Sequence, residues 1–598
     1  MNSRTVYAVL EDTANAYGGL PALHQPLGKG EYKSYTWNDY RAAVQEIACG
    51  LRGVGVAKGE IVAIHSETRA EFYLVDLGIM AAGAVSAALY TSYPLPELVR
   101  NIRASEAKTV FVENPKILRA LIGAAGEEPL SLRFILLTGE ADDTLTLDGV
   151  RAQGREALRS DPGLFEKIRS EVSVDDPAIL YLTSGATGEP KMGLVTQAAL
   201  AANADMGPVA LGLTPSDSTI VFLPSAHIAQ RVVGELVPLR LGVEVWFSES
   251  LAKLPNELRA IRPTFFLAPP RVWERVFASI NAELNKRGKF SKKLLYGAVG
   301  LGSEATRLKQ QGKPVPAWMR SSLKLADRLV FSKIRERLGG RLRIAASGAA
   351  PLGKELAEFY GSIGLPLIEG YGLTEAGVVT LNPIHNPRFG SIGKPLPGVE
   401  VRVDDDGELL IKSPCLFSGY YRDPVSTAAV MREGWLATGD IAEIDSDGYV
   451  FITGRKKELI VSSNGKKIYP TRVESLFKTE PLINQVLLIG DKLPYVTALF
   501  TLNVAHAESL KGMEDLKGKE AAEVVAAPAV VAEVQKAVTR ANKQLASFEQ
   551  IRKFRVLERD FSIETGELTP TMKVRRMKVL ENNRTVISEL YMGKEESK

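Results

Sequence analysis

The stretch "LYLTSGATGEPKMGLVTQ", residues 180–197, predicts a buried strand that runs into a loop of Ser, Thr and Gly and closes on Pro190 and Lys191. Such a loop offers many backbone N–H groups, several hydroxyls and one cation, which are the groups that bind polyphosphate. The spacing is not that of a Walker loop, and a Gly/Ser/Thr turn alone is more often only a turn. Phosphate binding is therefore a hypothesis that the rest of the chain must support.

Length and composition indicate a globular protein with several domains, because 598 residues, 45% of them hydrophobic, are too many for one core. The 74 Lys and Arg exceed the 70 Asp and Glu by only four, and a net charge of +4 is too small to favour nucleic acid as a partner. Two Cys and five scattered His predict neither disulfides nor a zinc site. With Glu11 and Asp12 in place of an apolar signal core, these features predict a cytoplasmic location.

Alternation of short β-branched runs with helical stretches predicts an α/β protein whose sheets are mainly parallel. Four such runs are expected to be strands, at residues 218–224, 243–249, 264–270 and 341–348. The apolar segment 71–90 is as long as a membrane span, but Asp76 within it favours a buried helix followed by a core strand. Functional loops should lie at the carboxyl ends of the strands.

Two further regions differ from this pattern. Residues 281–338 are rich in Lys and Arg and predict an inserted pair of surface helices, with a solvated face as the favoured interpretation and a peripheral membrane contact as the alternative. From about residue 390, alternating runs broken by Asp-Gly and Asn-Gly predict hairpins. The predicted division is an N-terminal body of residues 1–455, with a β-rich, barrel-like module over about 390–453, and a smaller α+β domain of residues 456–598.

Seven motifs occur in an order that resembles the ANL adenylate-forming enzymes, which include acyl-CoA synthetases, adenylation domains and luciferases. They are "TSGATGEPK" (183–191), "LPSAHIAQR" (223–231), "AASGAAPL" (345–352), "EGYGLTEAG" (369–377), "GWLATGD" (434–440), "GRKKELIVSSNGKKIYP" (454–470) and "LTPTMKVRR" (568–576). Residues 263–277 and 327–352, joined by the helical insert, resemble the long-chain fatty acyl-CoA synthetase branch. The resemblance covers essentially the whole chain.

This resemblance implies a reaction in two steps: ATP converts a fatty acid to an acyl-AMP with release of pyrophosphate, and the thiol of CoA then displaces AMP. Lys573 matches the catalytic lysine, which would bridge the carboxylate and the α-phosphate. Glu375 would hold Mg²⁺ with Thr183, and Thr374 would lie near the α-phosphate. His227 would lie near the substrate carboxylate or the acyl tunnel, with a hydrogen-bonded core His as the alternative.

The nucleotide-binding residues follow from the same motifs. Asp440 would accept hydrogen bonds from the ribose hydroxyls, and Arg455 would reach the same sugar. The loop residues expected to hold the phosphates are Thr183, Ser184, Gly185, Thr187, Gly188 and Lys191. The residues expected to pack on the adenine are Gly348, Ala349 and Ala350 with a turn formed by Gly370, Tyr371 and Gly372.

In this family the C-terminal domain rotates between the two steps, about a hinge residue that corresponds to Lys457. Lys573 would leave the site, and the hairpin around Gly465 would enter it to form the channel for the pantetheine arm of CoA. An ordinary type I′ turn needs the same Asn-Gly pair, so the hairpin alone does not prove this role.

Three departures from the family pattern bear on phosphate affinity. Ala186 replaces a Thr, Met192 a Gly and Gln197 a His. Loss of one hydroxyl that contacts a phosphate should cost about 1.5–3 kcal/mol, and Met192 would add about 1–2 kcal/mol of strain if its φ had to be positive. Two alternatives to a CoA ligase thus stay open: a ligase that passes the acyl group from acyl-AMP to a carrier protein or another acceptor, and a non-catalytic protein that binds nucleotide or acyl groups.

Overall fold

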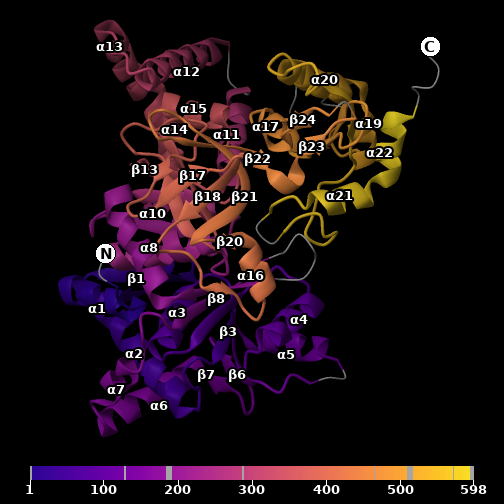
Figure 1. Ribbon diagram of the computed structural model, residues 1–598. Coiled ribbons are helices and arrows are strands. Elements are labelled where there is room, and N and C mark those ends of the chain that lie inside the picture. The colour runs from indigo at the N-terminus through magenta and orange to yellow at the C-terminus, as the bar shows by residue number, and fades with distance from the viewer. Residues whose placement is uncertain are drawn as a thin grey trace.

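Two mainly parallel sheets form the large body of the molecule, and a smaller domain lies beside it (Figure 1). The computed structural model describes residues 3–126, 129–183, 191–285, 289–463, 465–507, 516–569 and 572–592. The α/β class with mainly parallel sheets is confirmed.

The first sheet has eight strands, of which β8, β4, β3, β5, β6 and β7 run parallel. In spatial order the strands are β19 (Gly419–Tyr420), β9 (Lys191–Thr196), β8 (Pro177–Thr183), β4 (Val85–Leu89), β3 (Ile61–His65), β5 (Thr109–Val112), β6 (Arg133–Leu136) and β7 (Leu145–Thr146). The antiparallel pair β8–β9 flanks the phosphate-loop motif, and β9 also pairs with the edge strand β19.

The second sheet has nine strands and carries the loops that follow β10 and β13. Its spatial order is β16 (Lys394–Pro395), β15 (Gly377–Leu381), β14 (Leu367–Leu373), β13 (Ile344–Ser347), β12 (Phe265–Ala268), β10 (Ser218–Val221), β11 (Glu244–Phe247), β1 (Pro21–Gly28) and β2 (Glu31–Thr36). All four runs predicted to be strands, within residues 218–224, 243–249, 264–270 and 341–348, are confirmed.

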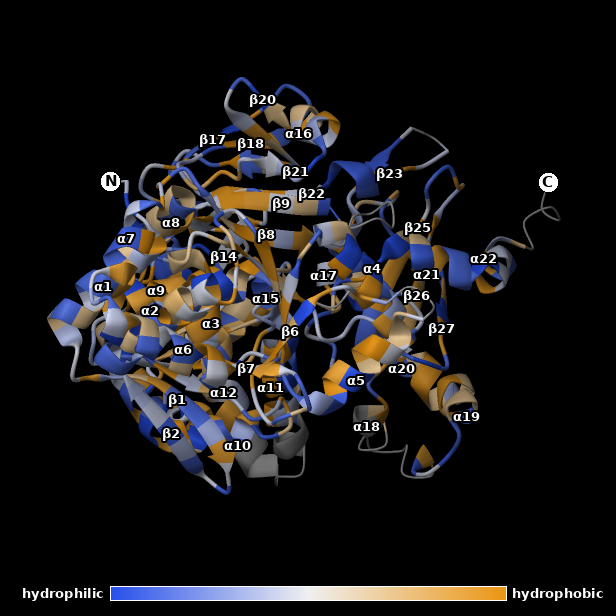
Figure 2. Ribbon diagram, turned by 90° about the horizontal axis from the view of Figure 1, so that it is seen from below, coloured by the Kyte–Doolittle hydropathy of each residue, from blue (hydrophilic) through white to orange (hydrophobic). Residues whose placement is uncertain are grey.

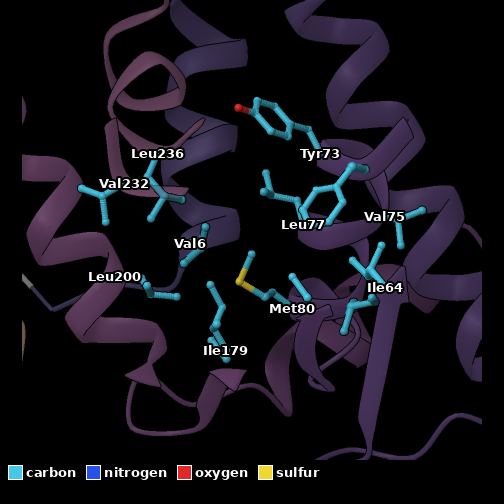
Figure 3. Close-up of a cluster of buried hydrophobic side chains, with 14 of the residues drawn as sticks. Val6, Ile64, Tyr73, Val75, Leu77, Met80, Ile179, Leu200, Val232 and Leu236 are labelled. Carbon is cyan, nitrogen blue, oxygen red and sulfur yellow. The ribbon is translucent and has the colours of Figure 1, made fainter. Parts of the chain in front are cut away.

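Helices cover both sheets and enclose two apolar clusters, a larger one that spans both sheets and a second one around Phe266 and Trp273. They include α1 (Val6–Tyr17), α2 (Trp37–Gly53), α3 (Ala70–Ala81), α4 (Leu95–Ser105), α5 (Pro115–Ala124), α6 (Leu147–Ser160), α7 (Leu164–Ser170), α8 (Gln197–Leu211), α9 (Val237–Leu241), α10 (Leu254–Ile261), α11 (Pro270–Asn285), α14 (Ser332–Arg335) and α15 (Lys354–Ser362). A π-helical segment, η1 (Gln230–Leu236), precedes α9. Figure 3 shows Met80 of α3 among Val6, Leu200 and Val232 from three other helical elements.

Helix α3 is the apolar segment that was expected to be a buried helix, and this prediction is confirmed. Every residue of α3 except Glu71 is buried, and β4 follows it in the core. Within the described ranges, no helix is both long and apolar enough to cross a membrane. Asp76 of α3 is fully buried and forms an ion pair with the equally buried Arg231 of η1.

A curled antiparallel sheet forms a half-barrel in front of the two large sheets, as predicted for the region after residue 390. Its strands are β17 (Glu400–Val403), β18 (Glu408–Lys412), β21 (Trp435–Ile444), β20 (Met431–Arg432) and β22 (Val450–Arg455), with α16 (Pro424–Val430) beside them. The hairpins β17–β18 and β21–β22 turn at the expected Asp-Gly pairs. Their pairing brings Asp440 directly opposite Arg455.

The C-terminal residues form a separate small domain with apolar clusters of its own, which lie within residues 460–590. Its strands are β23 (Ile460–Val461), β24 (Lys467–Ile468), β25 (Ile483–Ile489), β26 (Val496–Leu502) and β27 (Ile551–Val556). Its helices include α17 (Pro470–Ser475), α18 (Val504–Ala507), α19 (Ala521–Ala526), α20 (Pro528–Asn542), α21 (Arg576–Asn582) and α22 (Arg584–Tyr591). In Figure 2, orange segments lie in both parts of the molecule. The exact division after residue 455 stays a prediction.

Candidate functional site

Lys573 is the residue that joins the C-terminal domain to the rest of the candidate site. Its side chain is exposed, yet the protein around it excludes enough water to lower its pKa to about 8. Burial is the first cause, and the positive charge of Arg455 is the second, whereas Asp440 and Glu375 act in the opposite direction. Lys573 therefore lies within the electrostatic field of three predicted site residues from the large body.

The loop that carries Lys573 is a tight reversal. The N–H of Thr569 donates to the carbonyl of Lys573 at 2.8 Å, and the N–H of Lys573 donates to the Thr569 hydroxyl at 3.0 Å. Met572, next to Lys573, has a φ of +64°, in the left-handed region that non-glycine residues seldom adopt. Leu568 and Val574 close the loop with an isolated antiparallel bridge.

Asp440 is held by two side chains from neighbouring strands. The hydroxyl of Tyr371 donates to Oδ2 at 2.5 Å, and Arg455 Nε lies 3.0 Å from Oδ1. The Asp440 side chain is only 3% exposed, whereas that of Arg455 is 52% exposed. Burial, followed by the charge of Asp440, raises the pKa of Tyr371 well above its usual value, so this phenol stays protonated and donates. The result is a fixed carboxylate at the end of the half-barrel.

Glu375 is fixed in a similar way. The Tyr420 hydroxyl donates to Glu375 Oε1 at 2.6 Å, and burial together with this carboxylate raises the Tyr420 pKa. The ammonium of Lys191 lies 4.8 Å from the centre of the Tyr420 ring and donates to the Ser426 hydroxyl at 3.1 Å. The structure thus links the end of the phosphate-loop motif to Glu375 through Tyr420.

Tyr420 and Ser426 were not among the residues predicted from the sequence. Tyr420 lies in β19, which pairs with β9 and places Tyr420 opposite Gly193. The only sequence signal was the short polar and aromatic stretch "SGYYRDPVS" (418–426), which has no periodicity. Thr374 also approaches Gly193: its methyl group lies 3.6 Å from where a Cβ on Gly193 would be.

His227 lies in the loop between β10 and η1, at the carboxyl end of β10 as expected for a functional loop. Its Nδ1 accepts the N–H of Ala229 at 3.1 Å, which leaves the proton of the neutral ring on Nε2. Burial, and secondly the charge of Lys573, lowers the His227 pKa to about 3. His227 is therefore neutral at pH 7, and it lies close enough to Lys573 for the ammonium charge to affect its pKa.

Gly348, Ala349 and Ala350 follow the carboxyl end of β13, next to the glycines of β14. A Cβ on Gly348 would lie 3.2 Å from the carbonyl oxygen of Gly370, so a side chain there would crowd the neighbouring strand. Ala349 has a φ of +68°. The prediction of a turn at Gly370, Tyr371 and Gly372 is wrong, because these residues belong to β14 and pair with β15, where a Cβ on Gly372 would clash with the Gly377 carbonyl.

The central part of the phosphate loop, with Ser184, Gly185, Ala186, Thr187 and Gly188, lies outside the described residues. The backbone of Thr183 ends β8 and Lys191 begins β9, so the two ends of the loop are paired neighbours. The Thr183 side chain is also outside the description.

Met192 and Gln197, which were expected to affect the loop, have other roles. Met192 lies in β9 opposite Leu182 and does not have a positive φ, so the expected strain is absent. Gln197 is 1% exposed; its Oε1 accepts the N–H of Val6 at 3.0 Å, and its Nε2 donates to the Met80 carbonyl at 3.2 Å. Gln197 therefore ties helices α1 and α3 together instead of facing the loop.

Lys457 and Gly465 lie apart from this cluster. Lys457 is exposed in a single 3-10 turn, Lys456–Glu458, that connects β22 with the C-terminal domain. Gly465 has a φ of +73° at the tip of the β23–β24 hairpin. Among the described atoms beyond its chain neighbours, none lies within 4 Å of a Cβ placed on Gly465. The roles of Lys457 as a hinge and of this hairpin in a channel for CoA stay predictions.

The arrangement can bind an anionic ligand between the cation of Lys573 and fixed carboxylates. In the described residues, no group of three or more His, Cys, Asp or Glu side chains could hold a metal ion by itself. A divalent cation at Glu375 would need further oxygens from its ligand, which suits Mg²⁺ bound to phosphates. The donor set therefore fits a nucleotide with its own cation better than a protein-only metal site.

Comparison with known proteins agrees with this chemistry. Residues 10–421 match the model of the AMP-binding enzymes, and residues 457–595 match the C-terminal domain of AMP-binding enzymes. The long-chain-fatty-acid–CoA ligase FadD15 of Mycobacterium bovis is 34% identical over 574 residues, which cover 95% of this chain and 94% of the relative.

Two solved structures have a similar fold. The anthranilate CoA ligase AuaEII, in complex with anthranoyl-AMP, matches with a TM-score of 0.73 and 20% identity over 98% of both chains. The ATP-bound RpMatB-BxBclM chimera B1 matches with a TM-score of 0.72 and 23% identity over 98% of this chain and 100% of the other. Because the first family model covers more than half of the sequence, the chain belongs to the AMP-binding (ANL) family of adenylate-forming enzymes.

Proposed function

We propose that this protein is a long-chain fatty acid:CoA ligase that forms acyl-AMP from ATP and then transfers the acyl group to CoA. The position of Lys573 supports the adenylation step. Its pKa is affected by the charges of Asp440, Glu375 and Arg455, and its own charge lowers the pKa of His227. A cation contributed by a second domain to a site with fixed carboxylates can neutralise charge that develops on a phosphoryl group. The long-chain substrate and CoA rest on the 34% identical relative.

In the first step, a carboxylate oxygen of the fatty acid attacks the α-phosphorus of ATP. A P–O bond to the acyl group forms, and the bond to pyrophosphate breaks. Lys573 is protonated at neutral pH and would stabilise the negative charge shared by the carboxylate and the α-phosphate. Asp440, fixed by Tyr371 and Arg455, would orient the nucleotide by accepting hydrogen bonds from its ribose hydroxyls.

Neutral His227 would present its Nε2–H close to the same carboxylate, because Nδ1 is engaged with Ala229. Glu375 would hold Mg²⁺ through Oε2, since Oε1 accepts the Tyr420 hydroxyl. When bound, Mg²⁺ supplies charge neutralisation at the phosphate oxygens. In the second step, the CoA thiolate attacks the acyl carbonyl carbon, the thioester C–S bond forms, and AMP leaves with the electron pair of the broken C–O bond.

The test is mass spectrometry of the products formed from ATP, Mg²⁺ and fatty acids of graded length, with and without CoA. We expect acyl-CoA and AMP to accumulate only with CoA. Accumulation of acyl-AMP that CoA does not change would instead assign transfer to a carrier protein or another acceptor. If neither product forms with the wild-type protein, the non-catalytic alternative replaces this proposal. Lys573→Ala should lose acyl-AMP formation while it retains much of the ATP affinity.

A further inference from the structure

The helical insert carries an exposed apolar stripe that the proposed reaction does not use. Helix α13 (Ala317–Ala326) and the π-helical segment η2 (Asp327–Phe331) expose Trp318, Leu325 and Leu329, at 64%, 60% and 43% of their surfaces. These residues follow one another at intervals of seven and four, so they lie on one face of the helix. The adjacent side of the helix packs inward through Met319, which is buried. A large aromatic and two leucines on one solvent-facing stripe indicate a surface that contacts something apolar.

Cations border this stripe. Arg320, Lys324 and Arg328 are exposed, and in the part of the chain that the structure describes they have no carboxylate partner. Residues 289–333 contain ten Lys and Arg against two Asp and Glu, a net charge of +8. Because the whole chain carries +4, the rest of the protein has a net charge of −4. The positive charge of this protein is therefore concentrated on the insert.

The two acidic residues of this segment are already paired with arginines. Glu304 forms an ion pair with Arg307 at 2.6 Å, and Asp327 forms one with Arg335 at 2.7 Å. Both carboxylates therefore pair with arginines other than Arg320 and Arg328, and not with Lys324. Figure 1 shows α12 (Lys289–Gln310) and α13 at one end of the large body, beyond α15, where a flat partner could approach them.

We propose that the stripe Trp318, Leu325 and Leu329, with Arg320, Lys324 and Arg328, docks this protein peripherally on an anionic lipid bilayer. Trp and Leu side chains enter the boundary between headgroups and acyl chains, while the cations lie among anionic headgroups. A helix with an apolar stripe and basic flanks binds along the membrane surface instead of crossing it. A second copy of the chain is a poor partner for this face, because it would bring two segments of charge +8 together.

The first experiment measures co-sedimentation of the full-length protein with vesicles of equal parts phosphatidylglycerol and phosphatidylcholine. We expect the triple variant W318A/L325A/L329A to lose about tenfold or more in vesicle affinity. The matched control is L27A/V209A/L251A, which removes three other exposed apolar side chains, at 65%, 75% and 57% exposure, and should bind like the wild type. Equal thermal unfolding temperatures would show that both variants fold.

A second experiment separates the charge from the apolar contact. The variant K324E/R328E should lose binding to the mixed vesicles, and wild-type binding should fall with added salt and be weak on pure phosphatidylcholine. Brominated lipids should quench part of the tryptophan fluorescence of the wild type, and W318F should remove that quenching. Unchanged binding of the W318A/L325A/L329A variant would overturn the proposal. Self-association that depends on Trp318, without vesicle binding, would assign the stripe to a second copy instead.

Discussion

Lys478, in the C-terminal domain, contacts the carbonyl oxygen of Pro351, in the loop that follows β13 of the large body. Its ammonium also lies 3.8 Å from Glu274 Oε1 in α11. Lys478 lowers the pKa of the buried Glu369, which burial raises to about 7 and which accepts the N–H of Leu352. Lys478 therefore contacts the large body next to the predicted nucleotide site, towards which Lys573 also lies.

The contact between Lys478 and Pro351 should matter for acyl-AMP formation but not for thioester formation. Lys478→Ala should slow acyl-AMP formation, measured by exchange of pyrophosphate into ATP, by about tenfold, because it removes a hydrogen bond from a charged donor. Thioester formation from supplied acyl-AMP should change little. Arg540→Ala is the matched control, since Arg540 pairs with Glu480 inside the C-terminal domain. Equal loss in both steps would contradict an anchoring role.

The charge of Lys573 should set the alkaline limit of adenylation. Because its pKa is lowered from 10.5 to about 8, the ammonium is present at pH 7 and is lost as the pH rises through about 8. We expect the exchange rate to fall over this range. Lys573→Arg should be slower overall but should lack this fall, since a guanidinium keeps its proton. His227, with a pKa of about 3, should contribute no further change between pH 5 and 8.

Tyr371 should act on nucleotide affinity through Asp440. Tyr371→Phe removes the donor that holds Asp440 Oδ2, and we expect AMP binding, measured by calorimetry, to weaken by about tenfold. Tyr449→Phe provides the control, because its hydroxyl donates to the Asn386 carbonyl at 2.7 Å, away from Asp440. If AMP affinity stays unchanged in both variants, the Tyr371 hydroxyl does not position the ribose acceptor.

The buried cluster of Arg231, Asp76 and Glu235 should be critical for stability. Arg231→Met would leave two buried carboxylates without their cation, and burial already raises the pKa of both. We expect a loss of about 3–5 kcal/mol in the free energy of unfolding, measured with urea. The double variant Arg231→Met/Asp76→Asn should recover part of this loss. If Arg231→Met were as stable as the wild type, the two buried carboxylates would not depend on the charge of Arg231.

Local sequence signals were sufficient for much of the fold. Helix α3 and the hairpins β17–β18 and β21–β22 could be predicted because an unbroken apolar run and Asp-Gly pairs act over a few residues. The π-helical turn of η1 has no comparable signal. The ion pair between Asp76 and Arg231 joins residues 155 positions apart, so only the packing of α3 against η1 reveals it.

In the candidate site too, contacts between residues far apart in the sequence could not be predicted. Ordered motifs indicated Asp440, Glu375 and Lys573, whereas Tyr420 emerged only from the pairing of β19 with β9. The strain expected at Met192 was wrong because pairing with Leu182 keeps its backbone extended. Left-handed backbone occurs instead at Ala349 and Met572, where no glycine marked it.

The separate apolar clusters of the C-terminal domain have a thermodynamic consequence. Its side chains bury one another within residues 460–590, so a rotation of the domain about the 3-10 turn at Lys457 would open no apolar core. The two orientations can then differ by only a few kcal/mol, which leaves both populated during turnover. In such a balanced equilibrium, each polar contact across the boundary, at about 1 kcal/mol, would change the ratio of the two states by about fivefold. Substrates could thus select the orientation with very little binding energy.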